Sequence, residues 1–213
     1  MINLDNAINL VQTIAHNNKE HFTMSPSFLD HCKLTSMIAG NIAHSLGLDS
    51  NELCIAGCLH DIGRCFTKDQ EWHTFHEIIG ADYIERNGEE LYIGTETECY
   101  RIAQTIRSHG VVYEQYTMKE YDIYKNGLNV DKRDLLPSSW NELVIVYADL
   151  TNTNGKIVPF KQRLDDLKKN DKKKNNPRLH ALKKAQKRLL TIKKDMEQAL
   201  ISETTNNKYG VLQ

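Results

Sequence analysis

The sequence predicts an all-α fold, an irregular bundle of several helices followed by a basic helical extension at the C-terminal end. Apolar residues recur at intervals of three and four along most of the chain, the spacing that buries one face of a helix. Alternating apolar and polar runs, which indicate half-buried strands, are scarce. The 213 residues, 40% of them hydrophobic and 26% charged, suit one compact domain with an appendage. We expect seven to nine helices.

Eight segments carry the helical pattern: residues 4–16, 25–46, 50–62, 74–86, 97–109, 139–150, 160–170 and 177–202. The second of them begins at a capping serine, Ser25 or Ser27, with Pro26 in its first turn. Gly47 follows its last apolar residue and predicts its C-terminal end. The third ends in HDIG, where Gly63 breaks the helix and permits local unwinding.

The remaining segments are predicted to be loops. Residues 64–73 form a loop, and residues 110–138 are irregular, with a short helix around 119–125. The apolar run ELVIVYADL, residues 142–150, could form a buried strand, but no second strand is predicted to pair with it, so a helix is favoured. The Lys- and Asn-rich stretch KKNDKKKNNP, residues 168–177, is predicted to be a solvated hinge.

Charge divides the chain into an acidic body, residues 1–158, and a basic extension, residues 159–213. Residues 1–160 contain 12 Lys and Arg against 22 Asp and Glu, whereas residues 161–200 contain 14 against 5. The last helix has a heptad seam at Leu182, Ala185, Leu189, Ile192, Met196 and Ala199. We expect this seam to dock on the acidic body, and a homodimer through the C-terminal helix is the alternative. A nucleic-acid partner is not expected, because no aromatic residues interleave with the basic ones.

A cytoplasmic location and the absence of a membrane partner are expected from the first twenty residues and from the cysteines. Those residues have no basic start and no continuous apolar run, and no segment approaches the length of a membrane span. The five cysteines are odd in number and lack CxxC spacing, which indicates reduced thiols. Cys54 and Cys58, four residues apart, could hold a soft metal, but small apolar core residues are the favoured interpretation.

Six residues that can bind metal are predicted to face the interior. They are His31, His60, Asp61, His76, His109 and Asp149. Each lies three, four or seven residues from an inward apolar position, or at a helix end. A shared divalent cation would compensate the burial of all six, whereas separate hydrogen-bond networks would each need their own partners. Imidazole and carboxylate together favour Fe, Mn, Co, Ni or Zn, and the absence of thiolate disfavours a closed structural zinc site.

The order of these residues resembles the HD superfamily of metal-dependent phosphohydrolases. His31 comes first, His60 and Asp61 form the dipeptide that opens HDIG, and Asp149 comes last. The resemblance covers residues 25–155. It implies an HD-domain bundle and hydrolysis of a phosphoester or phosphoanhydride of a nucleotide or similar small phosphorylated substrate.

The remaining two histidines resemble those of the dinuclear branch, which includes symmetrical diadenosine tetraphosphate hydrolases. His76 stands in HEIIGA and His109 in IRSHG. The resemblance implies one ion at His31, His60, Asp61 and Asp149, and a second at Asp61, His76 and His109. Asp61 would then bridge two ions, and a water between them would attack phosphorus. One or two divalent transition-metal ions are therefore the expected cofactor.

Two arginines near the motifs are candidates for contacting substrate phosphate. Arg64 stands where many HDIG proteins have Lys, and Arg107 resembles an arginine of the dinuclear branch. Surface ion pairs are the alternative for both. His73 could be an accessory acid, but a solvated loop histidine is the favoured interpretation. The sequence GVVYEQY after His109 departs from the Thr-rich segment of the tetraphosphate hydrolases, and the GYP motif of the more distant HD-GYP phosphodiesterases is absent.

Two functions of other classes remain open. A regulatory HD module would bind a nucleotide or metal without catalysis, and it would signal through the basic extension. A structural metal protein would have a site closed to water and would unfold when a chelator removed the metal. The complete set of six candidate ligands favours an enzyme.

Overall fold

The computed structural model describes residues 1–67 and 75–209, with side chains up to residue 203. The predicted all-α class is confirmed. The helices of the body are α1 (Leu4–Asn17), α2 (Pro26–Ser45), α3 (Ser50–Leu59), α4 (His76–Asn87), α5 (Glu96–Arg107), α6 (Val112–Thr117) and α7 (Trp140–Leu150). The extension consists of α8 (Phe160–Lys173) and α9 (Arg178–Tyr209). No helix in the described part of the chain is long and apolar enough to cross a membrane.

Side-chain caps fix where the body helices begin. Ser25 caps α2 by accepting from the backbone N–H of Phe28, with Pro26 in the first turn as predicted. Thr95 and Ser139 each form a capping box with a glutamate three residues later, at the starts of α5 and α7. These caps satisfy backbone donors that a helix start would otherwise leave unpaired.

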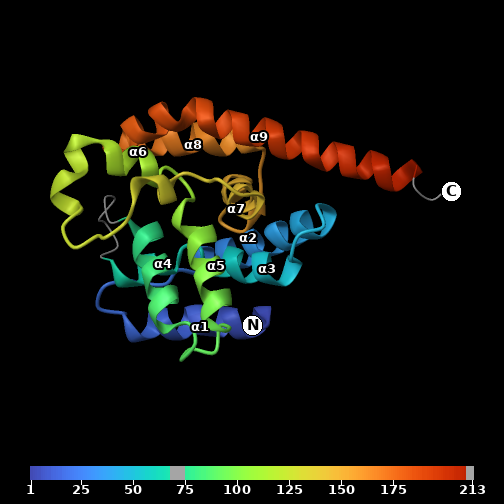
Figure 1. Ribbon diagram of the computed structural model, residues 1–213. Helices are drawn as coiled ribbons and strands as arrows, with labels where there is room; N and C mark the ends of the chain where they lie inside the picture. Colours follow the sequence, from blue (N-terminus) through green and yellow to red (C-terminus); the bar gives the residue numbers. More distant parts are fainter. Residues whose placement is uncertain (68–74, 210–213) are drawn as a thin grey trace.

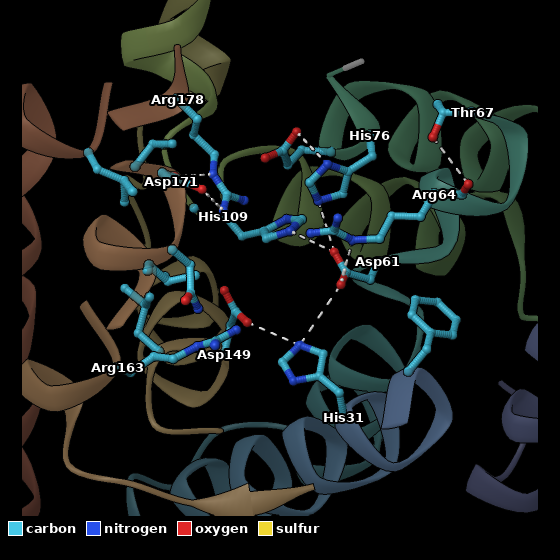
Figure 2. A pocket seen from close by; sticks show the side chains of 18 of the residues that line it. His31, Asp61, Arg64, Thr67, His76, His109, Asp149, Arg163, Asp171 and Arg178 are labelled. Carbon is cyan, nitrogen blue, oxygen red and sulfur yellow. Dashed lines mark hydrogen bonds and ion pairs between the residues drawn. The ribbon is translucent and has the colours of Figure 1, made fainter. Parts of the chain in front are cut away.

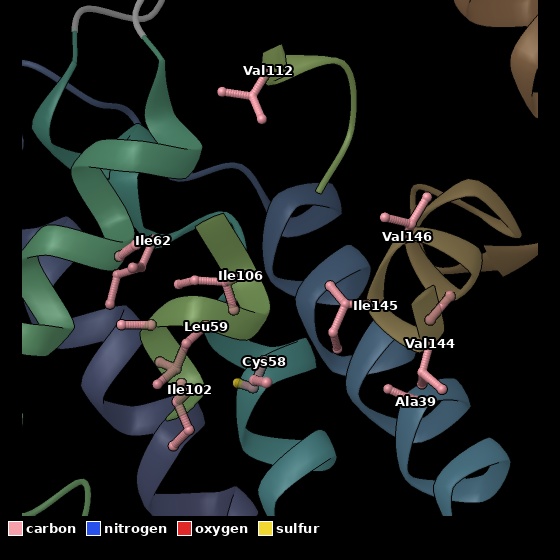
Figure 3. Packing of buried hydrophobic residues seen from close by; sticks show 14 of the residues in the cluster. Ala39, Cys58, Leu59, Ile62, Ile102, Ile106, Val112, Val144, Ile145 and Val146 are labelled. Carbon is pink, nitrogen blue, oxygen red and sulfur yellow. The ribbon is translucent and has the colours of Figure 1, made fainter. Parts of the chain in front are cut away.

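The core of the body lies between α2, α3, α5 and α7 (Figures 1 and 3). Leu59 and Ile62 pack with Ile102 and Ile106, and the apolar run of α7 is buried as a helix rather than as a strand. Cys58 belongs to this core and its thiol is free, which agrees with the favoured interpretation of the cysteines. Burial of this apolar surface fixes the helix ends that carry the candidate ligands.

The predicted break at Gly63 is wrong in position and in cause. Helix α3 ends at Leu59, and Asp61 has already left the helical region at φ −99° and ψ 9°. Gly63 lies inside the 3₁₀ helix η1 (Ile62–Phe66), which extends into the loop predicted for residues 64–73. A Cβ built on Gly63 would overlap the carbonyl oxygen of His76, so glycine here permits close contact with the start of α4. Residues 68–73 of that predicted loop, including His73, lie outside the described residues.

The segment predicted as irregular contains more structure than expected. Helix α6 was not predicted, and the 3₁₀ helices η2 (Lys119–Tyr124) and η3 (Lys132–Leu135) follow it. Two short strands, β1 (Asn152–Thr153) and β2 (Lys156–Ile157), form a hairpin in the predicted turn after α7. None of these elements reaches seven residues, and such short segments carry too few repeats for a periodic pattern to be visible.

The extension docks on the body as favoured. Helices α8 and α9 lie across α6 and α7 on one side of the bundle (Figure 1). The heptad seam is buried within the chain from Leu182 to Met196, so the alternative dimer contact would have to use other residues. The predicted solvated hinge is wrong: α8 continues to Lys173, and the carboxylate of Asp171 is buried and accepts two hydrogen bonds from Arg178.

Candidate metal centre

Five helices bring the six predicted ligands to one place. His31 projects from α2 and Asp149 from the end of α7. His60 and Asp61 follow α3, His76 begins α4, and His109 follows α5. Five of them line a single cavity (Figure 2). His60 is not among its lining residues and has no exposed surface.

The first group of donor atoms gathers around His31. Its Nε2 lies 3.1 Å from Nε2 of His60 and 3.1 Å from Oδ1 of Asp149. Oδ2 of Asp61 lies 3.9 Å from Nε2 of His31 and 3.8 Å from that of His60. Donor atoms of His31, His60 and Asp61 all lie within 4.8 Å of one another, a spacing at which one ion could contact all three.

The second group gathers on the other oxygen of Asp61. Oδ1 lies 2.9 Å from Nε2 of His76 and 3.6 Å from Nε2 of His109. These three residues also present donor atoms within 4.8 Å of one another. The two carboxylate oxygens of Asp61 therefore face two different groups of imidazoles, as a carboxylate that bridges two ions must.

Backbone carbonyls fix two of the imidazole rings. Nδ1 of His60 donates to the carbonyl oxygen of Gly57 at 2.8 Å, and Nδ1 of His109 donates to that of Ile106 at 2.6 Å. Because a carbonyl oxygen can only accept, the proton of each neutral ring is held on Nδ1. In the neutral ring the Nε2 lone pair points to the centre and can bind a cation, and for His109 this requires loss of the proton that the neighbouring Asp61 helps to retain.

Glu77 holds the equivalent position behind His76, and the predicted ligand set does not include it. Its Oε2 lies 3.3 Å from Nδ1 of His76, and the residue is 4% exposed at the cavity wall. A carboxylate behind a ligating imidazole orients the ring and raises its basicity. The dipeptide His76–Glu77 at a helix start was the available indication, but adjacent residues on a helix were expected to face different directions.

The charges in the site favour a bound cation. Burial would raise the pKa of Asp61, but Arg64, His60 and His76 hold it well below its usual range. Burial would also raise the pKa of Asp149, but the neighbouring His31 and His60 lower it by more, so this pKa is low as well. Both carboxylates are thus ionised near neutral pH, and burial lowers the pKa of His60 to about 4. Buried oxygen and imidazole donors without thiolate fit a divalent transition metal.

The two candidate arginines have different surroundings. Arg64 lines the cavity with a partly exposed side chain, and its Nε lies 2.8 Å from Oδ2 of Asp61. Arg107 is buried and donates to Asp82 at 2.9 Å and to Glu85 at 2.8 Å, both on α4. It does not line the described cavity, and its ion pairs join α4 and α5, so its contact with substrate stays a prediction.

The cavity has a volume of about 530 Å³ and is bounded by both parts of the chain. The body contributes the candidate ligands, Arg64 and the aromatic residues Phe22, Phe28 and Phe75. The extension contributes the opposite wall, with Arg163, Asp171 and Arg178 (Figure 2). This size is typical of pockets for small organic ligands.

Comparisons with known proteins identify the family of the matched region. The HD domain family model matches residues 28–149. Ribonuclease Y of Opitutus terrae is 42% identical over 71 residues, which are 33% of this chain and 13% of that protein. Ribonuclease Y of Thermotoga petrophila is 39% identical over 62 residues, 29% of this chain and 12% of that protein. The chain thus spans about an eighth of the length of these relatives. No solved structure gives a significant match.

Proposed function

The chain belongs to the HD domain family, and from that premise we propose that it is a metal-dependent phosphohydrolase acting on a nucleotide or a similar small phosphorylated substrate. The observation that carries the proposal is the position of Asp61. Its two oxygens face two separate groups of imidazole donors, 2.9 Å from His76 on one side and 3.8 Å from His60 on the other.

Each candidate ligand has a role in this proposal. One ion would be held by His31, His60, Asp61 and Asp149, and a second by Asp61, His76 and His109. Bound divalent ions would neutralise charge on the phosphoryl oxygens and lower the pKa of a water. His60 and His109 would offer Nε2 because backbone carbonyls hold their Nδ1 protons.

Arg64 would bind the phosphoryl group beside the ions. Its guanidinium lies against Asp61 and is partly exposed in the cavity, so its remaining N–H groups can reach an oxygen of the substrate. A planar guanidinium can donate two parallel hydrogen bonds to a phosphate. Arg64 therefore orients the phosphorus next to the metal centre and stabilises negative charge that develops on its oxygens.

Cavity shape supports a small substrate. The extension covers one side of the site, and the cavity offers Phe22 and Phe28 as an apolar surface for a base. A dinucleoside polyphosphate is one member of this class, and it remains a candidate through the resemblance of His76 and His109 to the dinuclear branch. RNA is the second candidate substrate, because the relatives that match are named ribonuclease Y.

The proposal is tested by measuring metal content and turnover together. Purified protein would be assayed with Mn, Co, Fe, Ni and Zn on nucleotides, diadenosine tetraphosphate, bis(p-nitrophenyl) phosphate and a short single-stranded RNA. We expect turnover of small phosphoesters, with at least about a hundredfold loss in Asp61→Asn together with loss of bound metal. Asp165→Asn, which changes an exposed carboxylate on α8, is the matched control.

Each of the other outcomes selects a different function. Turnover that survives Asp61→Asn unchanged would exclude the proposed mechanism. Cleavage of RNA alone would assign the second substrate. Tight nucleotide binding without turnover under any metal would indicate the regulatory module.

A further inference from the structure

Arg163 is a cation in the cavity wall with no partner of opposite charge among the described residues. It lies on α8, in the extension and beyond residues 28–149 that match the HD domain. Its Nε is buried and has no hydrogen-bond partner within the described part of the chain. A buried donor left unpaired is costly, and a ligand that accepts from it would recover that free energy.

The other arginines of the extension that reach the body or the cavity are neutralised. Arg178 donates to both oxygens of Asp171 at 2.9 Å, and Arg188 donates to both oxygens of Glu114. Both arginines therefore form ion pairs that stabilise the packing of the extension. Arg163 differs from them because it brings net positive charge to the cavity.

Packing holds Arg163 in place. Phe160 and Leu164, on either side of it in α8, are buried, and the ring of Phe160 stacks on Tyr147 at 5.7 Å between centroids. The far end of α8 is fixed by the buried carboxylate of Asp171. A binding group on a rigid helix loses little entropy when its ligand arrives.

Figure 2 shows Arg163 across the cavity from Arg64, with the candidate metal centre between these two sides. A substrate held at Asp61 and Arg64 by one phosphoryl group would extend toward Arg163. We propose that Arg163 binds a second phosphate of the substrate, so that the extension completes the binding site. This inference rests on the proposed function and narrows its substrate class to compounds with two or more phosphates.

The test uses probes that cannot be hydrolysed. Calorimetry would compare methylphosphonate with alkylene bisphosphonates whose two phosphonates are separated by one, three or five carbons, on Mn²⁺-loaded protein. We expect at least one bisphosphonate to bind the unmodified protein ten or more times more tightly than methylphosphonate. Arg163→Gln should remove that gain without changing the affinity for methylphosphonate, and Arg163→Lys should keep part of it.

Lys161→Gln is the matched control, because it removes one charge from an exposed position of the same helix. It should leave the gain intact. The proposal is overturned if no spacing gives a gain, if Arg163→Gln keeps it, or if Lys161→Gln loses it equally. Absence of turnover in the substrate panel together with an intact, Arg163-dependent gain would instead reject the proposed hydrolase function and leave the phosphate site standing.

Discussion

The guanidinium of Arg188 holds both carboxylate oxygens of Glu114, with Nε donating to Oε1 at 3.0 Å and Nη2 donating to Oε2 at 2.7 Å. Nη2 also donates to the carbonyl oxygen of Gly110, the residue after His109, at 3.1 Å. Arg188 belongs to α9 and Glu114 to α6. The pair therefore fastens the extension to the segment that follows one of the proposed ligands.

Removing one partner of this pair should destabilise the protein. We expect Glu114→Ala to lower the free energy of unfolding by about 2–4 kcal/mol, because it leaves a largely buried guanidinium unpaired. Urea denaturation measures the change, and a double-mutant cycle with Arg188→Ala isolates the interaction. Asp131→Ala, which breaks an exposed pair with Arg133, should cost much less, because solvent screens an exposed pair. Equal losses of stability for the two pairs would contradict the expectation that burial makes the Arg188–Glu114 pair more important.

Gly63 should tolerate no side chain. A Cβ at this position would overlap backbone atoms at the start of α4, so we expect Gly63→Ala to cost about 3 kcal/mol or more and to reduce metal content by moving His76. Gly127→Ala is the control: its φ is +85° but nothing lies within 4 Å, so only the backbone cost of about 1–2 kcal/mol applies. Thermal unfolding with metal analysis of both variants distinguishes steric overlap from a conformational requirement.

The long helices and the six candidate ligands could be predicted because both follow helical periodicity. Asp149, for example, lies four residues after Ile145 on the inward face of α7, and the structure places it 3.1 Å from His31. Periodicity says which face a residue occupies within its own helix. It says nothing about side chains that meet across helices, such as Arg107 with Asp82.

The errors arose where tertiary contacts decide the structure. Asp171 was assigned to a solvated hinge because lysines and asparagines surround it, yet Arg178 compensates its burial from the next helix. Arg163 was not singled out, because its importance lies in facing the cavity rather than in its sequence neighbours. Glu77 was missed for the same reason, since its contact with His76 depends on the local geometry of the helix start.

Glu77 should act as a positioning residue for His76. We expect Glu77→Gln to weaken the affinity for metal by about 10- to 100-fold, because the amide no longer supplies the charge that raises the basicity of the ring. Competition with a chelating dye measures that affinity. Glu89→Gln, on an exposed residue after α4, is the control. If both variants bind metal as the unmodified protein does, Glu77 has no such role and is a residue of the cavity wall alone.

The stability of the metal-free protein should have a maximum near pH 6.5, to which the pKa shifts of His60 and His109 contribute. Burial lowers the pKa of His60 to about 4, so below an unfolded-state pKa near 6.5 the unfolded chain binds a proton that the folded chain excludes. Stability then falls as the pH decreases from 6.5 toward 4. Burial would also lower the pKa of His109, but its hydrogen bond with Asp61 and the charges of Glu77, Asp61 and Asp149 raise it to about 9.

The raised pKa of His109 makes the stability decrease on the alkaline side. Its stabilisation is complete below pH 6.5 and is lost as the pH rises through 9, on the order of 2–3 kcal/mol. Urea unfolding of chelator-treated protein between pH 4 and 8.5 measures both limbs and stays below the range in which the raised pKa values of buried thiols such as Cys58 would add to the alkaline limb. His109→Gln should flatten the alkaline limb alone, whereas His44→Gln, on an exposed position of α2, should leave both unchanged. Because a divalent ion must displace the proton of His109, we also expect metal affinity to rise from pH 7 to 9 with release of about one proton. An alkaline limb that persists in His109→Gln would assign it to another group.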